Sequence, residues 1–364
     1  MGKLPMVYAR EGSVGFNEFI GKTLKSLAKD VRNAMPADFV ALVLGGGYGR
    51  GDGACVLREG KESLYNDFDL FLIVEKNMAV PPDVIAVTKK YEHMLNIEVD
   101  IGKPLTVNDI KHLPLQLMYQ DLLQAHVVLL GDEKILTENA PSYLLEPIPQ
   151  VDALRLLLNR GSGLLQAIRE AQALTLDPAH QMPDPDFIRR NREKCTLSFG
   201  DSLLIQAGNY VPPLHERLKR VKGIKPTIGF QNLGELKGLY EEAVTFKLRP
   251  DSLPFQQNTL EDLRLIAGYW VSVLLYVESK RTGKSWASAS AYADDSFIRE
   301  NEQHTHKKIP RNLVKNFKRG KVSLRYPREQ LYRQLAGLLD NVQVSNPKWN
   351  REAEAFLSLW KIYN

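Results

Sequence analysis

Short apolar runs and one long amphipathic stretch organise the first part of the chain. Residues 17–35 repeat apolar positions at helical spacing, which predicts a helix with one buried face. Three runs rich in β-branched residues predict buried strands at Phe39–Leu44, Phe68–Val74 and 97–101. A helix is predicted over 84–94, between the last two strands. This mixture of strands and helices indicates an α+β domain.

The pattern changes at a proline-containing stretch, residues 139–149, which reads as a boundary. A helix over 115–124 and a strand over 127–132 are predicted before it. After it, helical periodicity predominates, over 151–174, 187–206, 231–243, 260–280, 311–318, 328–342 and 352–363. We therefore expect an α+β domain over 1–145, built on a mixed sheet with flanking helices. A mainly α-helical domain follows over 146–364.

Composition places few limits on this picture. A chain of 364 residues is long enough for two domains with their own cores. The net charge of +5 suits an anionic ligand but does not demand nucleic acid. Two cysteines are too few for a disulfide framework, which favours a reducing, cytoplasmic compartment. The longest apolar stretch is too short to span a bilayer, so no membrane insertion is expected.

A glycine-rich turn follows the first predicted strand. It reads Gly-Gly-Gly-Tyr-Gly-Arg-Gly-Asp-Gly from Gly45 to Gly53. Glycines allow backbone N–H groups to approach phosphate oxygens closely, and Arg50 would add a charge-assisted contact. The dinucleotide-binding pattern G-x-G-x-x-G is not matched in any register, so a Rossmann fingerprint is not supported.

Three aspartates follow on the next two predicted strands. Asp67 and Asp69 are two residues apart, so their side chains project from the same face of one strand, and Asp100 lies on the neighbouring strand. Carboxylates at close quarters repel one another, and a divalent cation removes this cost. Mg²⁺ is typically bound by one or two carboxylates together with substrate phosphates. A third carboxylate would allow two ions to clamp the attacking and leaving oxygens of a displacement.

Each motif has a simpler interpretation when taken alone. A glycine-rich run is more often a plain turn, and an Asp-x-Asp pair is common at solvated strand ends. The order of strand, glycine turn, strand with Asp67 and Asp69, and strand with Asp100 is more specific. In this order the residues resemble the signature of the DNA polymerase β-type nucleotidyltransferase superfamily, and in particular a bacterial branch of nucleotidyltransferase-domain proteins.

The resemblance implies a role for each matched position. Asp67 and Asp69 would bind two Mg²⁺ or Mn²⁺ ions, and Asp100 would bind the catalytic ion and help to activate the acceptor hydroxyl. Gly46 and Gly47 would hold the triphosphate, within a nucleotide-binding turn that also includes Gly45, Tyr48 and Arg50. A helical partner usually closes one side of the cleft in this superfamily. The spacer before Asp67 is longer than in compact members, and residues 59–62 read as a surface hairpin tip.

Two further basic features are candidates for binding an anion. Lys194, on a predicted helix, is a candidate for contacting the outer phosphates, although an exposed basic helix start is the more common situation. The segment 307–333 carries ten Lys and Arg residues against Glu329 alone. It reads either as a solvated helical face or as a docking surface for an anion such as RNA, a nucleotide sugar or a phosphorylated polymer.

These features predict a metal-dependent enzyme that transfers a nucleoside monophosphate, with AMP from ATP favoured. The acceptor is an unidentified hydroxyl on a small molecule, sugar, RNA or protein, and pyrophosphate is released. The alternative is a catalytically weak nucleotide- or RNA-binding module that works through the basic segment.

Overall fold

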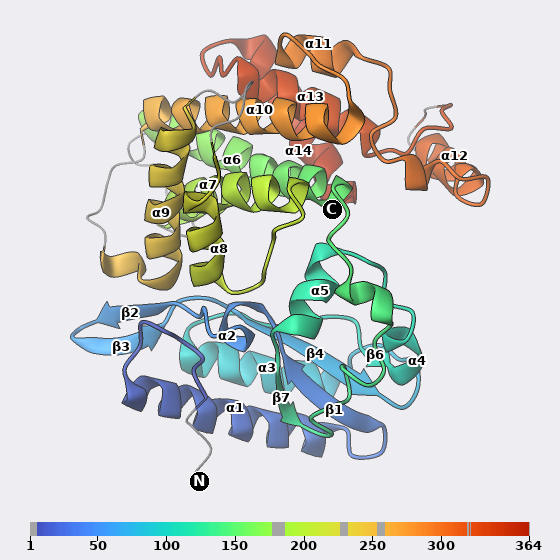
Figure 1. Ribbon diagram of the computed structural model, residues 1–364. Coiled ribbons are helices and arrows are strands. Elements are labelled where there is room, and N and C mark those ends of the chain that lie inside the picture. The colour runs from blue at the N-terminus through green and yellow to red at the C-terminus, as the bar shows by residue number, and fades with distance from the viewer. Residues whose placement is uncertain are drawn as a thin grey trace. The chain divides into compact units, whose positions relative to one another are not determined.

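A computed structural model of the chain describes residues 6–176, 186–225, 232–252, 259–318, 320 and 322–363 (Figure 1). Tertiary contacts divide the chain into two units. The first unit comprises residues 1–148 together with 209–220 and 244–255, and the second comprises the remainder. The first unit is an α+β unit built on a mixed sheet with flanking helices, and the second is helical. Two short segments from far along the chain thus belong to the first unit.

The main sheet of the first unit is centred on β1 and β4. Its strands are β1 (Phe39–Leu44), β4 (Phe68–Val74), β5 (Val99–Ile101), β6 (Leu105–Thr106) and β7 (Val127–Leu130). The order is β5-β4-β1-β7, and β6 also pairs with β4. β1 is antiparallel to β4 and β7, whereas β4 is parallel to β5 and β6. The predicted bounds of β1 and β4 are confirmed.

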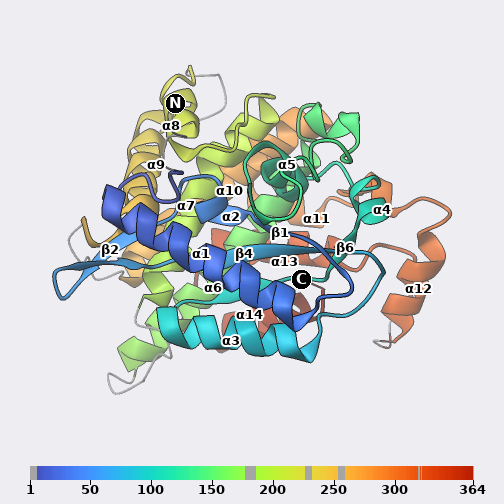
Figure 2. The ribbon, with the colours of Figure 1, turned by 90° about the horizontal axis from the view of Figure 1, so that it is seen from below.

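Alternate residues along the strands enter two separate cores. Phe68, Leu70 and Leu72 of β4 pack under α1 (Val14–Ala34) and α3 (Pro82–Leu95), which lie side by side across the sheet (Figure 2). Phe71 and Ile73 point to the opposite face, whose core is completed by the segment from 105 to 148. That segment contains α4 (Val107–Ile110), α5 (Leu117–Gln124) and η1 (Ser142–Leu145). A strand buried on both faces is expected to be apolar at nearly every position, as β4 is.

The spacer between the glycine turn and Asp67 forms a hairpin. Its strands are β2 (Cys55–Arg58) and β3 (Lys61–Leu64), and they pair only with each other. Glu59 and Gly60 both have positive φ at the exposed tip, as a tight two-residue hairpin turn requires. The predicted surface hairpin is therefore confirmed.

The second unit is built around α6, α7 and α10, which pack against one another. The Trp270 indole on α10 donates to the carbonyl of Leu157 at 2.8 Å and lies close against Gly161 on α6, where a side chain would clash. Its helices are α6 (Val151–Leu176), α7 (Phe187–Gln206), α10 (Leu260–Thr282), α11 (Ala289–Asp294), α12 (Ile309–Phe317), α13 (Glu329–Asp340) and α14 (Pro347–Tyr363). Two more helices, α8 (Leu214–Lys222) and α9 (Leu233–Leu248), are shared between the units. Among the described residues, no helix is both long enough and apolar enough to cross a bilayer.

Candidate functional site

The glycine turn and Asp69 are in direct contact. The ladder between β1 and β4 continues into the turn, where the N–H of Gly45 donates to the carbonyl of Asp69 at 2.9 Å. The next residue, Gly46, has a φ of 60° and opens a four-residue helix, α2 (Gly46–Gly49). A Cβ on Gly46 would lie 1.6 Å from Oδ2 of Asp69. Only glycine therefore fits both the backbone conformation and the space beside this carboxylate.

The turn leaves a row of backbone donors open. The N–H groups of Gly46, Gly47 and Tyr48 donate no hydrogen bond within the part of the chain that the structure describes. The Tyr48 ring is buried and packs edge-on against Phe68 at 5.1 Å between ring centroids. Its hydroxyl donates to the carbonyl of Ala54 at 2.7 Å. The Tyr48 side chain thus supports the turn from beneath, while its backbone N–H belongs to the open row.

The three predicted aspartates lie at one end of two neighbouring strands. β4 and β5 are parallel, and Asp69 is the register partner of Asp100. Paired residues of parallel strands share a face of the sheet, so the two carboxyl groups face the same way. Asp67 lies one residue before β4. Asp67 and Asp100 are exposed, whereas Asp69 is half-buried against the turn.

Burial and neighbouring negative charges make Asp69 the unusual acid of the three. Burial, followed by the charge of Asp67, raises the pKa of Asp69 to about 6, and Asp100 adds a smaller increase. The positive charges of Lys247 and Arg50 partly oppose this rise in pKa. A carboxyl group with such a pKa carries an unfavourable charge at neutral pH, and a nearby cation would stabilise its ionised form.

Lys247 is a site residue that the sequence analysis missed. It lies near the C-terminal end of α9, in a segment that belongs to the first unit. This segment is attached to the β2–β3 hairpin, since the N–H of Leu57 donates to Asp251 at 2.8 Å. The Phe246 ring also meets Tyr65 edge-on at 6.2 Å. No motif surrounds Lys247, so only the tertiary structure reveals that it is close to Asp69.

Arg50 is held in place by two acids. Its guanidinium lies 3.4 Å from Asp121 on α5 and 3.9 Å from Asp52. Asp52 is buried and accepts a hydrogen bond from the N–H of Leu214 at 2.9 Å. The Arg50 side chain therefore links the turn to α5 and, through Asp52, to the segment 209–220.

The remaining predicted positions lie in the second unit. Lys194 is on α7, and its side chain is exposed. The basic segment 307–333 runs through α12 into α13, and its members Arg319 and Lys321 lie outside the described residues.

The aspartates alone do not form a complete metal cage. Across the described ranges of the chain, no group of three or more His, Cys, Asp or Glu side chains is arranged to hold a metal ion. The carboxylates of Asp67, Asp69 and Asp100 share one end of the sheet without converging on a single point. Any ion bound there would need further ligands, such as water or the oxygens of a bound anion.

Comparison of the chain with protein-family models, with curated proteins and with solved structures found no match in any of the three.

Proposed function

We propose that this protein is a metal-dependent nucleotidyltransferase. It moves a nucleoside monophosphate, AMP from ATP being favoured, onto a hydroxyl acceptor and releases pyrophosphate. The observation that carries the proposal is the contact between Gly46 and the Asp69 carboxylate. It brings a row of open backbone donors beside an acid of raised pKa, at the end of the sheet that also carries Asp67 and Asp100.

The donor set fits a hard divalent cation that is only partly held by protein. Asp67, Asp69 and Asp100 would hold Mg²⁺ or Mn²⁺, and two ions would be accommodated if all three carboxylates took part. Mg²⁺ favours such sites, in which one or two carboxylates are joined by water and substrate phosphates. When bound, the ions would neutralise the carboxylates and stabilise the charge that develops on the phosphate oxygens.

The residues of the glycine turn would bind the triphosphate of the nucleotide. The N–H groups of Gly46, Gly47 and Tyr48, which donate no hydrogen bond among the described residues, would donate to phosphate oxygens. Lys247 brings a positive charge near Asp69 and would attract the same anion. In the reaction, the acceptor oxygen forms a bond to the α-phosphorus while the bond to the bridging oxygen of pyrophosphate breaks. Asp100 would accept the proton of the acceptor hydroxyl.

Nucleotide binding with matched variants tests the proposal. Titration of the protein with ATP in the presence of Mg²⁺ should give saturable binding that EDTA removes. Asp67→Asn and Asp69→Asn should each weaken this binding by at least about tenfold, which corresponds to about 1.4 kcal/mol. Asp340→Asn, at the exposed end of α13, serves as the control and should leave the affinity unchanged.

Release of pyrophosphate on addition of a hydroxyl-bearing acceptor would then establish turnover. Absence of ATP binding, or equal affinity in the wild type and both site variants, would contradict the proposal. Metal-dependent binding without pyrophosphate release from any acceptor would favour the binding module over the enzyme.

A further inference from the structure

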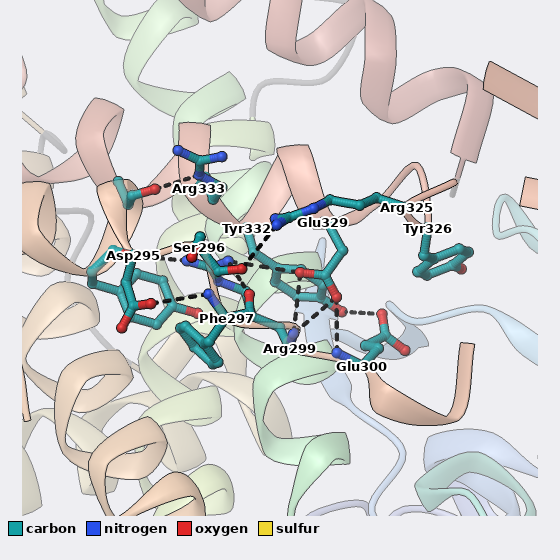
Figure 3. A network of polar contacts seen from close by, with 12 residues as sticks. Asp295, Ser296, Phe297, Arg299, Glu300, Arg325, Tyr326, Glu329, Tyr332 and Arg333 are labelled. Atoms are coloured by element: carbon teal, nitrogen blue, oxygen red, sulfur yellow. Dashed lines mark hydrogen bonds and ion pairs between the residues drawn. The ribbon is translucent and has the colours of Figure 1, made fainter. Parts of the chain in front are cut away.

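One segment projects from the helices of the second unit, and a buried network of hydrogen bonds joins its two ends. Residues 301–318, 320 and 322–328, hereafter the α12 excursion, belong to the second unit and lie between Glu300 and Glu329, the first residue of α13. The Glu329 carboxylate accepts hydrogen bonds from the N–H groups of Arg299 at 3.0 Å and Glu300 at 2.9 Å (Figure 3). The Tyr332 hydroxyl donates to the Glu300 carboxylate at 2.6 Å. The two ends of the excursion are therefore joined at a well-bonded base.

Helix α12 is oriented with its polar face inward. Asn312 and Asn316, one turn apart, are buried. The Asn312 amide donates to the carbonyl of Gln303 at 2.8 Å, and the Asn316 amide donates to the carbonyls of Ser323 and Arg325, each at 2.8 Å. These bonds attach α12 to the backbone on both sides of it. The helix is thus held by two buried amide groups, beside the half-buried side chains of Ile309 and Leu313.

Four apolar side chains of the excursion face solvent, whereas Ile309 and Leu313 of α12 are half-buried. Phe317 is 71% exposed and Val322 is 87% exposed, and Val314 and Leu324 are each more than half exposed. Val314 and Phe317 are three residues apart and lie on one side of α12, roughly opposite Asn312 and Asn316. In both views α12 projects away from the other helices of its unit (Figures 1 and 2).

The same surface carries positive charge that no acid of the excursion offsets. The sequence from 303 to 328 contains no Asp or Glu. Glu302, just before it, is paired with Arg155. Arg311 on α12 and Lys318, the residue that follows the helix, share the side of Val314 and are exposed. The pKa of Lys315 is lowered by burial and by the like charges of Arg311 and Arg328, which shows how closely these cations are crowded.

We propose that the α12 excursion docks the protein on the surface of an anionic phospholipid bilayer. Arg311 and Lys318 would contact lipid phosphates, because anionic headgroups attract cations near the surface. Val314, Phe317, Val322 and Leu324 would enter the boundary between headgroups and acyl chains. A helix that combines Lys and Arg with exposed Phe and Leu is typical of this kind of interfacial binding. The hydrogen bonds at the base of the excursion and those of Asn312 and Asn316 hold these exposed side chains in place.

Charge complementarity would also fit RNA, but the side-chain chemistry favours lipid. Single-stranded nucleic acid is bound by aromatic platforms beside a basic groove. Among the described residues of the excursion, the Phe and Tyr side chains are Phe317 and Tyr326, and Tyr326 is half-buried. The His304 ring is bonded to the N–H of Tyr326, which leaves His306 as the exposed imidazole. The exposed apolar groups are otherwise the aliphatic Val314, Val322 and Leu324, which contribute nothing to base stacking but insert readily among acyl chains.

Vesicle sedimentation tests the proposal with the full chain. Vesicles of phosphatidylcholine alone provide the neutral surface. Vesicles in which about 30% of the lipid is phosphatidylglycerol provide the anionic surface. The wild type should bind the anionic vesicles, bind neutral ones at least about tenfold more weakly, and dissociate as salt is raised.

Two double variants separate the contributions of charge and apolar contact. Phe317→Ser/Leu324→Ser and Arg311→Glu/Lys318→Glu should each lower binding to anionic vesicles by about tenfold or more. The matched controls are Leu145→Ser, which alters an equally exposed leucine, and Lys348→Glu/Lys361→Glu, which makes the same change of charge on α14. Both controls should bind as the wild type does. Circular dichroism and thermal unfolding would verify that each variant is folded.

Several results would overturn the proposal. These are failure of the folded wild type to bind anionic vesicles, equal binding to neutral vesicles, and equal loss in the control variants. Tight binding of single-stranded RNA that depends on Arg311 and Lys318, without anionic-vesicle binding, would assign the surface to nucleic acid instead. Since the probe is a vesicle without nucleotide, none of these results depends on the proposed transferase activity.

Discussion

Asp69 is the residue at which packing and chemistry oppose each other. Its carboxylate lies against Gly46, within reach of the charges of Asp67 and Asp100, and burial raises its pKa to about 6. In the unfolded chain the same group would ionise near pH 4. The folded protein therefore binds the Asp69 proton more tightly than the unfolded chain does, and ionisation of Asp69 at neutral pH disfavours folding. Such a position is expected for a residue retained for binding rather than for stability.

Replacing Asp69 with asparagine should stabilise the metal-free protein at pH 7.5. The free energy of unfolding in EDTA should rise by about 1–3 kcal/mol, because asparagine carries no charge that folding must bury. In the wild type this cost follows from a pKa about two units higher in the folded protein than in the unfolded chain. The sign of the pKa shift predicts that this gain disappears as the pH falls from 7 to 4, where wild-type Asp69 becomes protonated. Urea unfolding at several pH values measures the effect. Asp340→Asn, the exposed control, should change the free energy of unfolding by less than about 0.5 kcal/mol. A destabilised Asp69→Asn variant at pH 7.5 would contradict this account.

Gly46 should tolerate no side chain. Gly46→Ala would place a methyl group against the Asp69 carboxylate in a backbone conformation with positive φ. We expect a loss of about 1–3 kcal/mol in the free energy of unfolding, together with loss of ATP binding. The matched control is Gly268→Ala, since Gly268 lies on the exposed side of α10 with no atom near its missing side chain. This control should be neutral or stabilising by up to about 1 kcal/mol, because alanine favours helix. Equal stability of the two variants would show that the turn can relax away from Asp69.

At the scale of secondary structure, buried charge holds the second unit together near α13. The Arg299 guanidinium lies over the rings of Tyr292 and Phe297, at 4.5 and 4.4 Å from their centroids, and is fully buried. Glu329 lies 3.7 Å from this guanidinium and accepts the backbone N–H groups that precede the α12 excursion. A buried carboxylate with this many donors becomes costly to neutralise.

Glu329→Gln should therefore destabilise the protein by about 3 kcal/mol, since it leaves Arg299 without its nearest buried acid. Hydrogen exchange should accelerate at the amides of Arg299 and Glu300, which donate to this carboxylate. The matched control is Glu352→Gln on α14, where an exposed carboxylate lies 3.9 Å from Lys348. It should change stability by less than about 0.5 kcal/mol. Similar effects of the two substitutions would indicate that the network contributes little.

The elements that sequence predicted well are those with a strong local signal. β1 and β4 were predicted with the observed bounds, because both are unbroken apolar runs enriched in β-branched residues. β6 has two residues, and α4 that follows it has four, so neither shows a period. The position of Asp100 on the strand beside Asp69 was predicted from the sequence, and the structure adds that the two residues are register partners. The proximity of Lys247 to Asp69 was not predicted, because it depends on the return of residues 244–255 to the first unit.

For the whole molecule, the two units are interleaved along the chain. The first unit needs residues 209–220, which bond to Asp52, and residues 244–255, which bond to the β2–β3 hairpin. A single boundary after residue 145 was expected from the sequence, where strand periodicity changes to helix periodicity. That change does not show that later segments of the chain pack into the first unit. Removing the second half of the chain would therefore also remove parts of the first unit.

A fragment of residues 1–148 should consequently be less stable than the same residues in the full chain. We expect the fragment to lose protection from hydrogen exchange first at Leu57, whose N–H donates to Asp251 in a missing segment. The buried Asp52 carboxylate also loses the N–H donor of Leu214. The fragment's affinity for Mg²⁺ with ATP should also fall, because Lys247 is absent. Hydrogen exchange and ATP titration of the fragment beside the full chain provide the measurement. A fragment with full protection and full affinity would show that residues 1–148 fold and bind independently.

The return of the segment carrying Lys247 has a consequence for synthesis. Asp100 leaves the ribosome about 150 residues before Lys247, an interval of roughly 8–30 s at usual rates of translation. During that interval α6 and α7, which belong to the other unit, are already available to pair. A nascent chain must therefore begin its helical half before Lys247 exists, and the charges that act on Asp69 are complete only after translation has passed residue 247.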